Sequence, residues 1–553
     1  MSDRLSRGFV HAVTAALAVA GGWYVFAQGS PLPVMDEWDL LAKTGDGHLT
    51  FGWMIQHHGE HRFPLPKLLW LTALRATGYD FRAVMFVTLT LLVAASILLM
   101  WTARRARGRQ HPADALFPAL LLHWGHGFNL IMSFQLGFAL VAYALAGWLW
   151  CAGRAAAGSR LWLFGAVGYA LLVIPCGGFG VTFAPAVVGW CAWAARREWR
   201  AGRIAIGAVP FLAGVAAATY TAWVVATMPT GLNPTTSPVA DPLAFGAAFV
   251  GSLSVAVGTW PAEVPVARWL VGIAVVALYA VAVVRGCRKF QANPTPLRAA
   301  LLAVIGGTLL TAAATAYARG GGYAERMADA SAVGLAAAWL TLFGGWTGGR
   351  WVSAVAVFAV AGGLFWANWT PGLDHAIQTR HQTWHLRNDL LAGVPPTVLA
   401  SRHGYSGAVV VGELLARHVV TLRDMGLPDF RAVPDDPPAT AIPVVGLTLP
   451  LRVASPDDTP LDGLAVPATA VALRFRAHTP ADMVRDRVTL LWTDAATGRG
   501  YETEARPRPT VGDSYLLYPL HGKPTGLRLR PDAGITELRL LSAEWLTPVG
   551  GGR

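Results

Sequence analysis

The sequence predicts a polytopic α-helical membrane protein that ends in an extracytoplasmic α+β region, and three observations lead to this fold class. Of the 553 residues, 54% are hydrophobic and only 14% are charged, and the mean hydropathy is +0.43. This is more apolar than a soluble chain of that length. The apolar residues form runs of roughly 20, which is the length that crosses a bilayer. After about residue 370, Pro, Asp and Arg become more frequent and no further run could span.

Each apolar run is predicted to be a helix, because backbone groups that face lipid must be hydrogen-bonded internally. We expect about eleven spans, at residues 9–28, 81–102, 112–126, 134–152, 161–175, 178–195, 204–228, 266–285, 297–317, 330–346 and 351–369. The stretch 243–260 is predicted to be re-entrant or interfacial. Counting it as a span would move the basic loop 285–298 to the opposite side of the membrane.

The distribution of Lys and Arg predicts the orientation of the chain. Loops poor in basic residues alternate with basic ones at 104–109, 154–160, 196–200, 285–298 and the turn at Arg350. The N-terminus is therefore expected in the cytoplasm and the C-terminal region outside it. These loops also explain much of the formal net charge of +12, so the charge does not indicate nucleic acid as a partner.

The chain divides into a predicted membrane domain at 1–370, a helical extracytoplasmic region at 371–438 and a β-sandwich at 439–553. The segments LRNDLLAGV and GELLARHVVTLRDMG carry apolar residues at helical spacing. After PDDPP the pattern becomes the alternation typical of strands, as in VALRFRA, GLRLRP and ITELRLL. Trp545 on the last predicted strand could serve carbohydrate recognition or belong to the sandwich core.

An acidic stretch follows the first apolar run directly. The segment PLPVMDEWDLL, residues 31–41, places Asp36, Glu37 and Asp39 around Trp38. In the predicted topology it belongs to a first outer loop at 29–80. The same loop holds a second polar segment, QHHGEHRFPLPKLL, with His58, Glu60, His61, Arg62 and Lys67. A solvated loop would explain isolated charges, whereas two clusters in one loop favour a functional site.

These features together resemble the GT-C superfamily of integral-membrane glycosyltransferases, which use polyprenyl-phosphate sugars as donors. The resemblance rests on a long N-terminal membrane helix, an Asp-Glu pair at the head of a large outer loop, about eleven spans and an extracytoplasmic C-terminal domain. MDEWDLL followed by HHGEHRFPLPKLL resembles bacterial members of this type. The stretch TAYARGGGYAERMADASA, residues 315–332, matches a Gly-rich segment of such sequences, although Met327, Ala328 and Asp329 replace the Ser-Arg-Tyr ending expected there.

The resemblance implies roles for the residues of these motifs. Transfer of a sugar needs a base for the acceptor hydroxyl and groups that stabilise the departing lipid phosphate. Asp36 is the first choice for the base and Glu37 the second. Substrate binding is assigned to Asp39, Trp38, His58, Glu60, His61, Arg62, Lys67, Arg319 and Arg326. Arg319 and Arg326 flank the glycines and suit a phosphate, because a guanidinium offers two parallel hydrogen bonds.

No metal site is assigned. The segment HHGEH is not the HExxH arrangement, and Gly59 weakens a helix there. A divalent cation nevertheless stays open as a cofactor, because some members of the superfamily require one.

We therefore expect a hexosyl- or pentosyltransferase at the outer face of a bacterial cytoplasmic (inner) membrane, with a periplasmic C-terminal domain. Its partners would be the bilayer, a polyprenyl-phosphate sugar donor and a glycan, lipid or protein acceptor. Two other classes stay open: a secondary transporter or flippase of lipid-linked envelope intermediates, and a non-catalytic scaffold of envelope assembly. A transporter would carry more polar residues near the bilayer midplane, often in duplicated halves.

Overall fold

The computed structural model describes residues 2–44, 48–59, 61–156, 158–229, 238–318, 325–404, 409 and 414–434, and in the C-terminal region residues 439–443, 451–453, 458–461, 464, 466, 472–478, 488–505, 513–520, 523–531 and 538–548. Glu60, Arg319 and the glycines 320–322 therefore lie outside the described residues. Two compact units make up the chain. Unit 1 contains Met1–Pro31 and Leu49–Arg380, and unit 2 contains Leu32–His48 and His381–Arg553.

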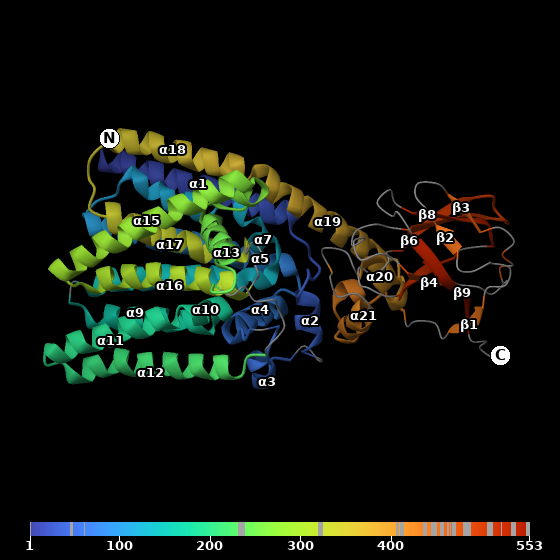
Figure 1. Ribbon diagram of the computed structural model, residues 1–553, viewed down its shortest axis with the longest axis horizontal. Coiled ribbons are helices and arrows are strands. Elements are labelled where there is room, and N and C mark those ends of the chain that lie inside the picture. The colour runs from blue at the N-terminus through green and yellow to red at the C-terminus, as the bar shows by residue number, and fades with distance from the viewer. Residues whose placement is uncertain are drawn as a thin grey trace. The chain divides into compact units, whose positions relative to one another are not determined.

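Unit 1 is a helix bundle whose long members run roughly parallel or antiparallel (Figure 1). Its longest helices are α1 (Asp3–Gln28), α5 (Phe81–Arg107), α8 (Leu136–Ala155), α12 (Ile204–Ala226), α15 (Pro265–Ala292), α16 (Pro296–Ala318) and α18 (Arg350–Ala367). The shorter helices α9 (Arg160–Val173), α11 (Ala184–Arg200) and α17 (Ala328–Phe343) lie among them. Among the described residues, seven helical segments are long and apolar enough to cross a membrane. The chain is a multi-pass membrane protein.

All but one of the predicted apolar runs coincide with helix in unit 1, and the exception is 112–126. The predicted single span there is wrong, because this segment and the residues after it form the short pieces η1 (Pro112–Ala115), α6 (Leu116–Leu121), η2 (Trp124–His126), α7 (Gly127–Ile131) and η3 (Ser133–Gln135). Pro112 and Pro118 cannot donate backbone hydrogen bonds. The His111 and His123 rings instead accept the N–H groups of Ala113 at 3.2 Å and Gly125 at 3.0 Å.

One further predicted span is interrupted, and the stretch predicted to be re-entrant or interfacial contains only short helices. The run 178–195 divides at Phe183 into α10 (Gly178–Thr182) and α11. The stretch 243–260 forms α13 (Pro242–Ser254), η5 (Val255–Val257) and the start of α14 (Trp260–Glu263). With 13 residues, α13 is shorter than the roughly 20 residues that a span requires.

Turns that carry predicted basic loops contact one another at one end of the bundle. The Arg109 guanidinium donates to the carbonyl of Thr347 at 3.0 Å, and the His111 Nε2 lies 3.1 Å from the carbonyl of Gly348. Between these residues Asp114 forms a buried ion pair with Arg107, with exposed fractions of 0% and 2%. Gln110 also donates to Asp114, at 2.6 Å. This end of the bundle is thus held by a carboxylate that is fully surrounded by donors.

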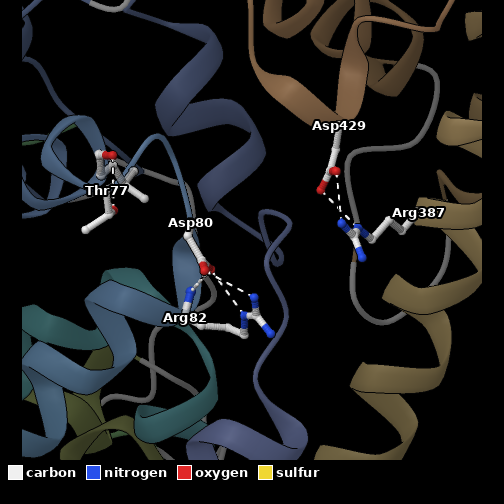
Figure 2. A network of polar contacts seen from close by, with 6 residues as sticks. Thr77, Asp80, Arg82, Arg387 and Asp429 are labelled. Carbon is white, nitrogen blue, oxygen red and sulfur yellow. Dashed lines mark hydrogen bonds and ion pairs between the residues drawn. The ribbon is translucent and has the colours of Figure 1, made fainter.

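Short helices gather at the opposite end of unit 1, where α3 (Phe51–Ile55), α4 (Pro64–Ala76), α7 and α10 lie close together (Figure 1). Asp80 precedes α5 at this end and accepts the Arg82 N–H at 3.0 Å together with the guanidinium of the same residue (Figure 2). An Asp at this position satisfies an N–H group that the helix itself leaves unpaired.

Unit 2 begins with α2 (Glu37–Ala42) and contains the second half of α19 (Trp369–Leu391), followed by α20 (Pro396–His403), α21 (Leu414–Asp424) and η7 (Pro428–Phe430). These helices confirm the helical character predicted for the region 371–438. Helix α2 packs against α21. The Arg387 guanidinium donates to both oxygens of Asp429, at 3.0 and 3.1 Å, and so ties α19 to η7 (Figure 2).

The C-terminal strands form the predicted β-sandwich. They are β1 (Ala439–Pro443), β2 (Leu451–Val453), β3 (Thr459–Pro460), β4 (Ala472–His478), β5 (Val488–Asp494), β6 (Gly500–Ala505), β7 (Asp513–Pro519), β8 (Pro524–Pro531) and β9 (Leu538–Pro548). One sheet has the order β1-β9-β4-β7, with β2 also on β9, and the other has the order β3-β8-β5-β6. Both sheets contribute to one core, in which Trp545 is 1% exposed. Of the two roles considered for Trp545, the core role is confirmed.

We predict that Asp114→Asn destabilises unit 1 strongly, because the variant leaves the Arg107 charge buried without its partner. Breaking a buried pair in this way costs about 3–5 kcal/mol. The matched control is Asp80→Asn, at a pair whose side chains are 37% and 39% exposed. Asn also caps helices well, so its cost should be about 0–1 kcal/mol. Thermal unfolding of the purified protein in detergent measures both, and equal midpoints would contradict the prediction.

Candidate functional site

The acidic stretch in unit 2 forms a tight turn that leads into α2. Glu37 is fully buried, and its Oε2 accepts the backbone N–H of Val34 at 2.8 Å. Met35, inside this turn, has a φ of 52°, a left-handed conformation that side chains other than Gly rarely adopt. Trp38 is also fully buried and meets the Phe430 ring edge to face, with centroids 5.8 Å apart. Glu37 and Trp38 thus fix the backbone that carries the other two carboxylates, Asp36 and Asp39.

Asp36 and Asp39 are the partly exposed carboxylates of this stretch. Asp36 stands immediately before α2, where its backbone carbonyl accepts the N–H of Leu40 at 3.0 Å and its side chain makes no helix-capping bond. Asp39 forms an ion pair with Lys43 one helical turn later, at 2.5 Å. The side chain of Asp36 is therefore oriented differently from that of a conventional helix cap.

A buried histidine on α21 belongs to the same neighbourhood of unit 2. His418 is 7% exposed. Burial lowers the pKa of His418, and the positive charges of Arg417 and Lys43 act in the same direction, whereas Asp39 raises it. The α2–α21 contact therefore contains a neutral imidazole near the Asp39 carboxylate.

In unit 1 the backbone at His58, Gly59 and His61 has the geometry of a turn rather than of a helix. His58 and His61 exchange backbone hydrogen bonds of 2.9 and 3.2 Å across Gly59, which has a φ of 57°. The His61 ring lies 5.6 Å from Phe63, and the His58 ring lies 6.1 Å from Phe134. Two histidines four residues apart on a helix would be needed for the simplest metal pair, and the backbone here does not provide that geometry.

Two cations of the first predicted loop bind the protein's own backbone. Lys67 is 1% exposed and donates to the carbonyls of Trp53 at 2.9 Å and Gln56 at 2.8 Å. A positive charge stabilises carbonyls at the C-terminal end of a helix, here α3. Arg62 donates to the carbonyl of Ile55 and to the Thr227 hydroxyl.

Among the described residues, the last predicted cation is Arg326 in η6, just before α17. Its guanidinium lies 5.3 Å from the centre of the Phe128 ring, a cation–π contact. Its backbone carbonyl accepts from the Asn129 amide at 3.3 Å. Arg326 thus stands where α7 meets the beginning of α17.

Asp329, where the predicted motif departed from the expected ending, forms a fully buried pair with His126 at 2.6 Å. The other ring nitrogen of His126 lies 2.7 Å from the carbonyl of Leu120. A carbonyl only accepts, so that nitrogen must carry a proton, and a second proton must lie between the ring and the carboxylate. The pair as a whole is therefore neutral, which suits its burial.

The predicted site residues fall into two groups. Unit 2 contains Asp36, Glu37, Trp38 and Asp39, whereas unit 1 contains His58, His61, Arg62, Lys67 and Arg326. Glu60 and Arg319 lie outside the described residues. Among the residues that are described, no three His, Cys, Asp or Glu side chains gather as a metal site with three protein ligands would require.

A cavity in unit 1 is lined mostly by residues that the sequence motifs did not identify, although Glu325 belongs to the motif at 315–332. It has a volume of about 260 Å³ and is lined by residues of η2 and α7, of the turn before α14, of η6 and of the first turns of α19. Asn368 stabilises this region, since its amide donates to the Val257 carbonyl at 3.0 Å and its Oδ1 accepts the Trp260 N–H at 3.2 Å. The contributing segments are far apart in the sequence, so no local pattern marked them together.

No protein-family model matches the chain, and no curated protein matches it. Among solved structures, the chain is similar to arabinosyltransferase EmbB from Mycobacterium smegmatis, determined by single-particle cryo-EM. The two are 13% identical, with a TM-score of 0.33, over 97% of this chain and 65% of that chain. This chain thus spans about 65% of the length of that structure.

We predict that His418 makes the α2–α21 contact sensitive to acid. Its pKa in the folded protein is lowered below the ordinary value of about 6.5. The unfolded chain therefore binds more protons at mildly acidic pH, and stability falls as the pH drops from about 6.5 toward the lowered pKa. Hydrogen exchange of α21 at pH 7 and at mildly acidic pH should show greater loss of protection in the wild type than in His418→Gln. An equal loss in both proteins would contradict this role.

Proposed function

We propose that the chain is a membrane glycosyltransferase that moves a sugar from a polyprenyl-phosphate donor to an extracytoplasmic glycan, lipid or protein acceptor. The resemblance of MDEWDLL and HHGEHRFPLPKLL to GT-C enzymes supports this reaction class. The observation that carries the proposal is the placement of Asp36, a partly exposed carboxylate at the start of α2, in the loop that follows the first membrane helix. A carboxylate in that position suits a general base that water and an acceptor can reach.

In the proposed reaction Asp36 removes the proton of the acceptor hydroxyl. The acceptor oxygen forms a bond to the anomeric carbon, the bond from that carbon to the phosphate oxygen breaks, and polyprenyl phosphate leaves with the electron pair. Glu37 is a positioning residue in this scheme, because its carboxylate holds the Val34 N–H and so shapes the turn that carries Asp36. Trp38 anchors the same turn against Phe430, and Asp39 supports substrate binding beside Lys43.

Cations near the glycine-rich stretch are proposed to stabilise the departing phosphate. Arg319 and Arg326 are the first candidates, since a guanidinium binds two phosphate oxygens at once. Lys67 is a weaker candidate than its charge suggests, because it is buried and donates to two backbone carbonyls. His58, Glu60 and His61 are proposed to bind the donor phosphate or the acceptor sugar, with Arg62 beside them.

The proposed location is a bacterial cytoplasmic membrane, with the N-terminus in the cytoplasm and the C-terminal domain outside. The basic turns around Arg109 contact the turn at Thr347, so the positive-inside bias acts on one end of the bundle. Donor sugar would then reach the other end, where the short helices gather.

The test is transfer of radiolabelled sugar from a panel of polyprenyl-phosphate donors by the purified full-length protein, with a bacterial envelope lipid and glycan extract as acceptor. Wild type should transfer label, and Asp36→Asn should lower kcat about 100-fold or more, because a general base contributes at least that factor. The matched control is Asp424→Asn, an exposed carboxylate on α21 that is outside the proposed site and whose loss should leave the rate unchanged. Asp39→Asn, in the proposed substrate-binding set, should lower the rate only a few-fold. The elution profile and the unfolding midpoint of Glu37→Gln show whether the turn still folds when the Glu37 carboxylate is replaced.

Full activity of Asp36→Asn would place the base elsewhere. If the wild type binds donors but releases them unchanged on the opposite side of a proteoliposome, the chain is a flippase. Failure to bind or turn over every donor would favour a scaffold, and the enzyme proposal would then be wrong.

A further inference from the structure

Helix α19 carries two histidines one turn apart on an exposed face. His381 and His385 are both exposed, and their Nε2 atoms lie 3.1 Å apart. The two rings meet edge to face, with centroids 4.3 Å apart. Residues at i and i+4 are neighbours on a helix surface, so one stretch of regular helix is enough to bring the rings together. Both histidines belong to unit 2, whose part of α19 begins at His381.

The separation of the two nitrogens is close to the one that a single metal ion requires. A bond from Zn²⁺ to a histidine nitrogen measures about 2.0–2.1 Å. Two such nitrogens therefore lie about 3.3 Å apart on a tetrahedral ion and about 2.9 Å apart when the bonds meet at a right angle. The distance of 3.1 Å in α19 falls between these values. The rings need little movement to bind one ion together.

The other use of this geometry is a hydrogen bond from one ring to the other, which the same distance allows. That bond takes one N–H group and one lone pair. A neutral imidazole can carry its proton on either nitrogen. When the donating ring carries its proton on Nδ1 instead, the Nε2 lone pairs of His381 and His385 are both available for a metal ion. The pair can therefore exchange its hydrogen bond for an ion without a change in the backbone.

The neighbouring positions on this face accommodate a positive charge. The residues one turn before and after the pair are Ile377, Gln378, Asn388 and Asp389, and none of them is basic. Asp389 is already bound to Arg402 at 3.0 Å, so two neutral amides, Gln378 and Asn388, are the exposed polar groups next to the pair. Arg380 adjoins His381 in sequence, but residues at i and i+1 do not face each other on a helix.

The ligand atoms select the kind of metal ion. Imidazole nitrogens suit Zn²⁺, Cu²⁺ and Ni²⁺, whereas Mg²⁺ and Ca²⁺ prefer oxygen. Within the described part of the chain no third His, Cys, Asp or Glu joins the two rings. Water or a ligand from outside the chain would therefore complete the coordination. This is an open site, unlike the closed sites of four protein ligands that serve a structural role.

We propose that His381 and His385 form a binding site for one divalent transition-metal ion of the Zn²⁺ and Cu²⁺ class. The Nε2 atoms of the two rings are the protein ligands. The inference does not depend on the proposed function, because it uses neither the carboxylates of the first outer loop nor a sugar substrate.

Isothermal titration calorimetry of the full-length protein in detergent, purified without a polyhistidine tag, tests the site with Zn²⁺ as the probe. The wild type should bind Zn²⁺, and an excess of Mg²⁺ should not displace it. His381→Gln and His385→Gln should each weaken binding about ten-fold or more, since even the loss of a group that only orients a ligand costs about that factor. Both positions are exposed, so folding should stay intact, which the unfolding midpoint verifies.

Two control variants separate the pair from histidines in general. His48→Gln removes another exposed histidine of unit 2 and should bind Zn²⁺ as the wild type does. His385→Gln combined with Asn388→His keeps the number of histidines but places them two turns, or about 10 Å, apart along the helix axis. This variant should bind as weakly as His385→Gln alone.

Electron paramagnetic resonance of bound Cu²⁺ shows how many imidazoles bind, through hyperfine coupling to nitrogen. Two nitrogens are expected in the wild type and at most one in each single variant. The proposal is overturned if the wild type binds no Zn²⁺, if either single variant binds as tightly as the wild type, or if the relocated histidine restores binding. A single coupled nitrogen in the wild type would likewise overturn it, since the ion would then be held by one surface histidine.

Discussion

The need to satisfy every backbone hydrogen bond in lipid is the constraint on which the membrane half of this protein depends. Where helices continue, the backbone satisfies itself. Where the helices break, buried polar side chains accept the hydrogen bonds instead. The His111 and His123 rings, for example, accept the N–H groups of Ala113 and Gly125. Asn368 has the same role between α18 and α19. Its side-chain NH2 donates to the Val257 carbonyl, and its Oδ1 accepts the Trp260 N–H. The interrupted segments are therefore also the places where polar chemistry can enter the bundle.

This distribution makes the ends of the bundle chemically different. One end holds arginines and the fully buried Asp114, whose charge is matched by Arg107. The segments that meet at the cavity contribute aromatic rings and carboxylates instead. The neutral pair of His126 and Asp329 lies buried between helices, so it adds no net charge to either end. Arg326 lies against the Phe128 ring that lines the cavity, so this region also carries a cation.

Much of the fold was predictable because its signals are periodic and local. Apolar runs marked the helices, and the alternation in VALRFRA and GLRLRP marked β4 and β8. The prediction of a single span at 112–126 failed for a local reason. Pro112 and Pro118 interrupt the helix in a run that is apolar by composition. For the candidate site, the sequence predicted which residues take part but not which of their side chains are buried. Nothing in the sequence separates the buried Glu37 from the partly exposed Asp36 next to it, because burial depends on Trp38 and Phe430 packing together.

The cavity could not be predicted for a different physical reason. Trp124, Glu325 and Asp374 are far apart in the chain, and only Glu325 lies in a motif that the sequence analysis identified. Only the close approach of η2, η6 and α19 brings these three residues to one cavity. The rings of Trp23 and Trp369 stack on Trp124 from α1 and α19, so the cavity wall depends on helix packing that no single stretch of sequence encodes.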